Sequence, residues 1–244
     1  MYDIALSVSA CARSGTRADV AWMLAPVVSD EALAFTPGGG RIGHLMGGAF
    51  DGLLSDVAAR KLPSGRRIRH IVTEFESAMS GLPAHSDVEF LIVPADQFPT
   101  TLWPLLLERQ AVSVTATLDG DDVTAVTVSA GQPEGGPTSA AIDHPAVFVQ
   151  ESEVTTVLAP ITRLVIAGQG AIAEAIAAQG DLLGWRTVIE RRPPMVAGLA
   201  AGLSPLDGIV VMGHDVEAAG TCLMAALESS AGYIGALGST AMHE

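Results

Sequence analysis

One stretch of sequence decides the fold of the C-terminal part of the chain: Leu164-Val165-Ile166-Ala167-Gly168-Gln169-Gly170-Ala171. Its first four residues form a continuous apolar run, which is typical of a strand covered on both faces. The glycines that follow allow a tight turn directly into a helix, predicted over residues 171–183 with Ile172, Ile176 and Leu183 facing inward. We therefore predict a strand–turn–helix unit that begins near residue 161.

The same alternation continues to the C-terminus. A second buried strand is predicted over residues 187–189 and a third over residues 209–212. A helix over residues 216–227 then precedes a last strand at residues 233–234. Strands that alternate with helices in this way predict a doubly wound parallel sheet with right-handed crossovers. Residues 161–244 are therefore expected to form a Rossmann-like domain.

Residues 1–160 show a different pattern, in which short apolar runs alternate with turn residues and two helical segments. Val88, Phe90 and Ile92 alternate along one predicted strand, and residues 111–129 have the pattern of a β-hairpin. Helices are predicted near residues 50–58 and 102–107. Strands are predicted at residues 147–149 and 154–159, and Cys11 is placed in an apolar run, as an inert buried thiol or a ligand at a strand end. The first domain is therefore expected to be mixed α/β.

Composition narrows the range of functions. The 244 residues include 27 acidic and 13 basic side chains, for a formal charge of −14. This acidity disfavours nucleic acid as a partner, because phosphate binding needs concentrated Lys and Arg. Every stretch without Asp, Glu, Lys or Arg is shorter than the roughly 18–20 residues of a membrane span. With two distant cysteines and no secretory signal pattern, we expect a cytoplasmic protein with free thiols, no disulfide and no membrane association.

The glycine turn is also the leading candidate for a ligand site. Gly168 and Gly170 allow the tight turn and a close approach of the backbone to a pyrophosphate, and the backbone N–H groups of Gln169, Ala171 and Ile172 would face that ligand. About 20 residues after Gly170, where a ribose-binding carboxylate is expected, comes Glu190. It is followed by Arg191 and Arg192, which could instead take a 2′-phosphate. The alternative is that the glycines only build the turn.

Other polar residues have two interpretations each. His214 follows the third strand at the carboxyl edge of the sheet, so it is either a site residue or the entry to a helix that Asp215 caps. The histidines lack the spacing of a helix-borne zinc site, and we predict no metal site. A basic segment forms either a local anion patch or a solvated turn and a protected edge strand. Its members are Arg60, Lys61, Arg66, Arg67 and Arg69.

Several segments occur in a characteristic order along the chain. In the second half they are Phe148-Val149-Gln150, Leu158-Ala159-Pro160, residues 164–170, Leu183-Gly184-Trp185-Arg186-Thr187-Val188, Val210-Val211-Met212-Gly213-His214-Asp215 and Tyr233-Ile234-Gly235-Ala236-Leu237-Gly238-Ser239. In the first half, Gly43-His44-Leu45-Met46-Gly47-Gly48-Ala49-Phe50-Asp51 leads into a predicted helix. In order and spacing these segments resemble the XdhC/CoxI family, the accessory factors of xanthine dehydrogenase and carbon monoxide dehydrogenase.

The resemblance implies a maturation factor rather than a turnover enzyme. Members bind the molybdenum cofactor, protect it while its sulfido ligand is installed, and deliver it to a molybdenum hydroxylase. They are commonly homodimers with an N-terminal α/β domain and a Rossmann domain. By resemblance, the cofactor would lie between the Gly47-Gly48 turn, where a flat pterin would approach the backbone, and the Rossmann glycine turn.

The sequence also departs from the family pattern. Ala49 and Ala84 stand where the family has cysteines, and Ala171 replaces a histidine in the glycine turn. The family also continues through a further helix and strand beyond Gly238-Ser239. Because alanine cannot ligate a soft metal or carry sulfur, we expect binding rather than thiol chemistry.

Two other functions remain open. One is an NAD(P)-dependent oxidoreductase, although the only lysine is Lys61 and no Tyr-x₃-Lys pair is present. The other is a degenerate, non-catalytic paralogue that acts as a scaffold.

Overall fold

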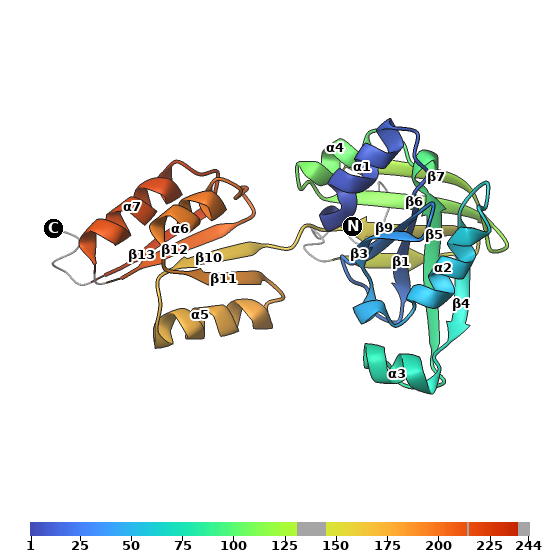
Figure 1. The fold of residues 1–244 in the computed structure, drawn as a ribbon, viewed down its shortest axis with the longest axis horizontal. Helices are drawn as coiled ribbons and strands as arrows, with labels where there is room; N and C mark the ends of the chain where they lie inside the picture. Colours follow the sequence, from blue (N-terminus) through green and yellow to red (C-terminus); the bar gives the residue numbers. More distant parts are fainter. Residues whose placement is uncertain (131–144, 214, 239–244) are drawn as a thin grey trace. The chain divides into compact units, whose positions relative to one another are not determined.

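The structure is a computed structural model that describes residues 1–130, 145–213 and 215–238. The chain divides into two compact units, Met1–Pro160 and Ile161–Glu244 (Figure 1). The first unit is built on an antiparallel sheet and the second on a parallel one, which confirms the predicted α/β class. None of the described helices is long and apolar enough to cross a membrane.

The first unit contains a nine-stranded sheet in the order β3-β2-β1-β5-β4-β7-β6-β9-β8. The predicted hairpin is confirmed by the antiparallel pairing of β6 with β7. The strands are β1 (Asp19–Ala25), β2 (Ala32–Thr36), β3 (Gly40–His44), β4 (Arg66–Ile71), β5 (Asp87–Pro94), β6 (Val112–Asp119), β7 (Asp122–Ala130), β8 (Ala146–Val149) and β9 (Glu153–Leu158). Every neighbouring pair is antiparallel.

Both faces of this sheet carry a buried core, because side chains alternate along each strand. Trp22 of β1 faces one core together with α1 (Ala5–Arg13) and α4 (Leu102–Leu107). Met23 faces the other core with α2 (Asp51–Ala59). The predicted alternation of Val88, Phe90 and Ile92 is confirmed, since all three lie in this second core. Three short 3-10 helices, η1 (Tyr2–Ile4), η2 (Met46–Gly48) and η3 (Ala95–Gln97), connect these elements.

The N-terminal apolar run is helical, so the alternative that placed Cys11 as a ligand at a strand end is wrong. Ile4 and Val8 are buried, whereas Leu6 between them is 64% exposed. This spacing of four residues places one stripe of a helix against α4. Cys11 is partly buried near the end of α1 and packs against that core.

The second unit has four parallel strands in the order β11-β10-β12-β13. Helix α5 covers one face of the sheet, and α6 and α7 cover the other, as Figure 1 shows. This is the predicted doubly wound arrangement. The elements are β10 (Arg163–Ala167), α5 (Ala171–Leu182), β11 (Arg186–Glu190), α6 (Pro193–Ala200), β12 (Gly208–Met212), α7 (Val216–Leu227) and β13 (Tyr233–Leu237).

Two packing predictions for this unit are wrong. Val188 and Ile189 of β11 are 38% and 41% exposed, because β11 lies at the edge of the sheet rather than inside it. Ile176 of α5 packs against the core as predicted, but Ile172 and Leu183, which directly follows the helix, face away from the sheet and are about 60% exposed. The fully buried positions of α5 are small residues, Ala173 and Gly180, which allow the helix to approach β11 closely.

The short helix α6 was not among the predicted elements. Its first two residues, Pro193 and Pro194, suit a helix start, where backbone N–H groups have no intrahelical partner.

Candidate functional site

The glycine turn joins β10 to α5 as predicted, and each glycine has a separate role. A side chain at Gly168 would overlap the Met212 backbone of the neighbouring strand, so only glycine fits there. Gly170 has φ 95° and ψ −177°, a conformation that is essentially restricted to glycine. Nothing lies within 4 Å of the position that its Cβ would occupy, so this residue faces open space.

Helix α5 begins directly after this turn and has no side-chain cap. Gly170 occupies the N-cap position and makes no side-chain hydrogen bond to the first helical turn. The first N–H groups of a helix lack intrahelical acceptors and carry the positive end of the helix dipole. They are therefore oriented to receive an anionic group from outside the helix.

A cavity of about 860 Å³ lies at the carboxyl ends of β10 and β12. The helices that follow these two adjacent strands, α5 and α7, cover opposite faces of the sheet. In open α/β sheets, ligands bind at the carboxyl ends of two such strands. The turn, the start of α5 and Arg191 form one part of its lining, and the end of β12 and α7 form the rest. The lining residues are Ala167, Gly168, Gln169, Gly170, Ala171, Ile172, Arg191, Met212, Gly213, Asp215, Ala218, Ala219, Cys222, Leu237 and Gly238.

The structure brings most of the predicted site residues together at this cavity. Residues 168–172 and Arg191 all line it. His214 lies outside the described residues. The contribution of Ala218 and Cys222 was not anticipated, because the sequence pattern of α7 does not show which face meets the end of β12. Asp215 does cap α7, as expected, since its Oδ1 accepts hydrogen bonds from the backbone N–H groups of Glu217 and Ala218 at 3.1 Å.

Cys222 is a core residue on the inner face of α7. It is 5% exposed, and burial raises the pKa of its thiol. A thiol that remains protonated is a poor nucleophile and a poor metal ligand. Its position in the cavity wall therefore contributes packing rather than reactivity.

A smaller hollow of about 330 Å³ adjoins the turn at the end of β11. It shares Gly168, Gln169 and Arg191 with the larger cavity. Its other lining residues are Ile189, Glu190 and Arg192. The two hollows therefore meet at the glycine turn, with Arg191 on the boundary of both.

Glu190 is held by its neighbours in the chain. Its Oε1 accepts hydrogen bonds from the backbone N–H groups of Arg191 (2.9 Å) and Arg192 (3.0 Å) and from Nε of Arg192 (2.9 Å). Its Oε2 accepts another from Nη2 of Arg192 at 2.7 Å. The Arg192 side chain and these backbone donors lower the pKa of Glu190 to about 2. The carboxylate thus stays ionised and is already engaged in the chain itself.

Arg191 contrasts with its two neighbours. Its backbone N–H donates to Glu190, but its side chain is exposed, and the guanidinium makes no hydrogen bond or ion pair with any residue that the structure describes. Arg192, by comparison, is paired with Glu190. Arg191 is therefore the cation that this edge of the sheet offers to a ligand.

The Gly47-Gly48 turn belongs to the first unit and has a different electrostatic character. Gly47 and Gly48 have φ values of 61° and 84°, in the left-handed region. The Met46 N–H donates to Oε2 of Glu31 at 2.8 Å, and the Asp51 carboxylate lies beside Gly48. Two carboxylates thus flank the turn, and that of Asp51 is in turn paired with Arg41, whose Nη1 lies 2.6 Å from Oδ2.

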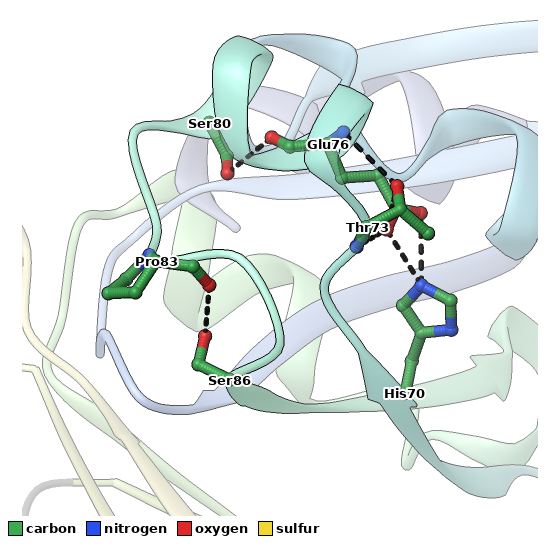
Figure 2. Close-up of polar contacts among 6 residues, drawn as sticks. All are labelled: His70, Thr73, Glu76, Ser80, Pro83 and Ser86. Carbon is green, nitrogen blue, oxygen red and sulfur yellow. Dashed lines mark hydrogen bonds and ion pairs between the residues drawn. The ribbon is translucent and has the colours of Figure 1, made fainter.

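Helix α3 (Glu74–Ser80) contacts this turn. Figure 2 shows the hydrogen bonds between Thr73 and Glu76 at its start and from the Ser80 hydroxyl to the Glu76 carbonyl near its end. Glu76 N–H donates to Thr73 Oγ1, while Oε2 of Glu76 accepts from the Thr73 N–H at 2.8 Å, which is a capping box. His70 of β4 lies 2.8 Å from the same carboxylate. Burial opposes ionisation, but the hydrogen bonds from Thr73 and His70 hold the pKa of Glu76 below its usual value. The helix ends at Gly81, with φ 74°.

The family cysteine positions are occupied by alanines with no reactive role. Ala49 is 8% exposed and packs in the core beneath α2. Ala84 lies in the loop between α3 and β5. In the described parts of the chain, no group of three or more His, Cys, Asp or Glu side chains is arranged to hold a metal ion.

The basic segment of β4 is not an open anion patch. Arg67 and Arg69 both pair with Glu89, and Arg69 also lies 3.1 Å from the Asp121 carboxylate. Arg66 pairs with Asp122 at 3.6 Å. Strand β4 lies between β5 and β7, although it meets β7 only at Arg66, so it is not a simple edge strand. Cross-strand carboxylates offset these charges.

Comparison with known proteins identifies the second unit. Residues 164–244 match the family model of the XdhC Rossmann domain. The second unit is therefore an XdhC-type Rossmann domain. No curated protein matches the chain. A solved structure described as a xanthine dehydrogenase from Bacillus halodurans has a TM-score of 0.53 and 19% identity, with 100% of this chain and 84% of that chain covered. At this identity the likeness shows a shared fold, and it extends across both units of the chain.

Proposed function

We propose that this protein is an accessory factor of the XdhC/CoxI type, which binds the molybdenum cofactor and supplies it to a molybdenum hydroxylase of the xanthine or carbon monoxide dehydrogenase type. The observation that carries the proposal is the cavity at the uncapped start of α5. The match of residues 164–244 to the XdhC Rossmann domain supports an accessory role, and the cavity supports a phosphate-bearing ligand.

The residues of the cavity fit the phosphate of such a cofactor. The N–H groups of the first turn of α5 would bind the phosphate oxygens, and Arg191 would add a positive charge at the rim. The apolar side of the cavity, formed by Met212, Ala218 and Cys222, suits a flat ring system. When bound, the cofactor would bring the molybdenum centre that the client enzyme needs.

The positions at which the family has cysteine or histidine offer no ligand to the metal itself. Alanine occupies positions 49, 84 and 171, and Cys222 is held as a buried thiol. We therefore propose that this chain binds and shields the cofactor without forming a covalent bond to it, and that any sulfur transfer uses another protein.

A dinucleotide is the second candidate ligand, because the glycine turn lies beside a hollow at the end of β11. An oxidoreductase would also need a proton donor near the reacting carbon. Among the described lining residues, Asp215 is engaged as a helix cap and Cys222 is buried. Hydride transfer to or from a nicotinamide by the purified protein would favour this alternative over the maturation role.

The test is retention of the pterin during gel filtration after incubation of the full chain with molybdenum cofactor. Ile172→Glu and Ile172→Gln form a matched pair, since this side chain is 62% exposed and lines the cavity. A carboxylate in the first turn of α5 favours the helix dipole, so the fold is preserved, but it repels a phosphate.

Wild type and Ile172→Gln should retain the pterin, and Ile172→Glu should bind it about tenfold more weakly or worse. Loss of retention by the wild type, or equal retention by both variants, would contradict the proposed site. A chain that retains neither pterin nor nucleotide would instead be the non-catalytic scaffold.

A further inference from the structure

We infer that the hollow at the end of β11 is a second anion subsite, and that the Rossmann unit prefers a nucleotide phosphorylated on its ribose to one with free ribose hydroxyls. The inference rests on the proposed function only in that both place a phosphate at the turn formed by residues 168–172. The inference adds a second phosphate, carried on the ribose, which the hollow at the end of β11 would bind.

The first argument concerns Glu190, which stands where a ribose-binding carboxylate is expected. A carboxylate binds a ribose by accepting hydrogen bonds from its hydroxyl groups. Glu190 already accepts four hydrogen bonds, three of them at Oε1 and one at Oε2. To bind Glu190, a ribose hydroxyl would have to displace the charged Arg192 donors at 2.7 and 2.9 Å. An unmodified ribose would therefore gain little binding free energy from Glu190.

The second argument concerns Arg191, whose side chain lines both hollows. In Rossmann domains, an arginine at the end of this strand accommodates a 2′-phosphate. The Arg191 guanidinium is exposed and has no partner among the described residues, so no existing interaction must be broken when it binds. A guanidinium can contact a phosphate with two parallel hydrogen bonds.

The third argument is the placement of positive charge in the second unit. Its arginines are four in number: Arg163, Arg186, Arg191 and Arg192. Arg163 and Arg186 begin β10 and β11, at the amino end of the sheet and away from the cavity. Arg192 is neutralised by Glu190. The positive charge at the ligand edge is thus concentrated on Arg191, which matches one additional phosphate.

Isothermal titration of the full chain with NADP⁺ and NAD⁺ tests this subsite, because the two probes differ only in the 2′-phosphate. Adenosine 2′,5′-bisphosphate and adenosine 5′-monophosphate repeat the comparison without the nicotinamide half. We expect the 2′-phosphorylated member of each pair to bind about tenfold more tightly or better, because it gains one charge-assisted contact with Arg191.

The decisive variant is Arg191→Ala, which should bring the affinity ratio of each pair to about one. This change keeps the backbone N–H that Glu190 accepts, so the contacts between Glu190 and Arg192 remain. Arg60→Ala, an equal change of charge at an exposed position of the first unit, should leave the ratio unchanged. Equal or tighter binding of NAD⁺, or a ratio that survives in Arg191→Ala, would overturn the inference.

The outcomes separate this inference from the proposed function. If neither probe binds but the pterin is retained, the subsite is refuted and the maturation role stands. If NADP⁺ is preferred but no pterin is retained, the subsite stands and the maturation role falls.

Discussion

The carboxylate of Glu190 and the guanidinium of Arg192 form a two-point contact at the end of β11, with Nη2 2.7 Å from Oε2 and Nε 2.9 Å from Oε1. Arg192 is two residues from Glu190 and directly precedes α6, so one short segment both closes on itself and begins a helix. Arg191 lies between them in the chain and donates its backbone N–H to Glu190, but its guanidinium pairs with neither residue.

Removal of this contact should change the titration of Glu190. In Arg192→Ala the pKa of Glu190 should rise from about 2 toward its ordinary 4.5, because the largest cause of the lowering is lost. A carboxylate with a lowered pKa stabilises the fold above pH 4.5, and that contribution is lost as the pH falls toward 2. Carbon-13 NMR titration of the side-chain carboxyl measures the shift.

The matched variant for this titration is Arg191→Ala, which keeps both backbone donors and the Arg192 side chain. It should leave the pKa of Glu190 close to 2. An unchanged titration in Arg192→Ala would show that the backbone N–H groups alone hold the carboxylate ionised.

Addition of a methyl group at the glycine turn should destabilise the second unit. The Cβ of Gly168→Ala would overlap the Met212 backbone, so β10 and β12 would have to separate. We expect a loss of about 1–3 kcal/mol in the free energy of unfolding, as for other overpacked sites. Urea denaturation followed by circular dichroism measures it.

Gly213→Ala is the control for this change, because nothing lies within 4 Å of its Cβ position and its φ is not positive. Its free energy of unfolding should stay within about 0.5 kcal/mol of the wild type. If both variants unfold at the same denaturant concentration as the wild type, Gly168 is not required by packing.

Asp207 should stabilise the second unit at the amino end of its parallel sheet, opposite to the cavity. It is 2% exposed, its Oδ1 accepts the Arg163 N–H at 2.9 Å, and its Oδ2 accepts both the N–H and the hydroxyl of Ser204. Asp207→Asn keeps the size but removes the charge and turns an amide group toward these donors. We expect a loss of about 2–3 kcal/mol in urea denaturation.

Glu228→Gln makes the same change of charge at an exposed position of the same unit and should have little effect. Comparable stability of the Asp207 and Glu228 variants would show that solvent replaces the buried hydrogen bonds of Asp207.

The capping box of α3 should control the local stability of that helix. None of the residues of α3 is buried, so its stability depends on its ends. Glu76→Ala removes the acceptor of the Thr73 N–H and the partner of His70, at a cost of about 1 kcal/mol. Hydrogen exchange of the α3 amides should accelerate about fivefold.

Glu74→Ala is the comparison for α3, because Glu74 is 82% exposed and lies in the same helical turn without joining the capping box. It should change exchange by less than Glu76→Ala does. Equal acceleration would assign the effect to the helix dipole rather than to the capping box.

Much of the fold follows from local sequence patterns. The apolar run before Gly168 and the glycines after it predict a strand, a turn and a helix, and these elements depend only on neighbouring residues. The hairpin of β6 and β7 is predicted for the same reason. The exposure of Val188 and Ile189 is not predicted, because a strand at a sheet edge and a strand at its centre can have the same apolar sequence.

In the candidate site, too, some features follow from the local sequence and others depend on the tertiary structure. Gly170 and Arg191 can be assigned from the spacing of a strand, a glycine turn and a second strand, and both line the cavity. The engagement of Glu190 by Arg192 is not evident from the sequence, since it depends on the rotamers of two adjacent charged side chains. The pairing of Arg69 with Glu89 and Asp121 depends on strand order, which residue spacing does not reveal.

The outer strand of the parallel sheet has a consequence for handling the protein. Strand β11 presents an open row of backbone groups together with Val188 and Ile189, a combination that promotes intermolecular β-sheet formation and aggregation. Charged residues stand at both ends of this strand, Arg186 at its start and Glu190 at its end. They act as gatekeepers against self-association, so neutralising either one should lower the concentration at which the protein remains in solution.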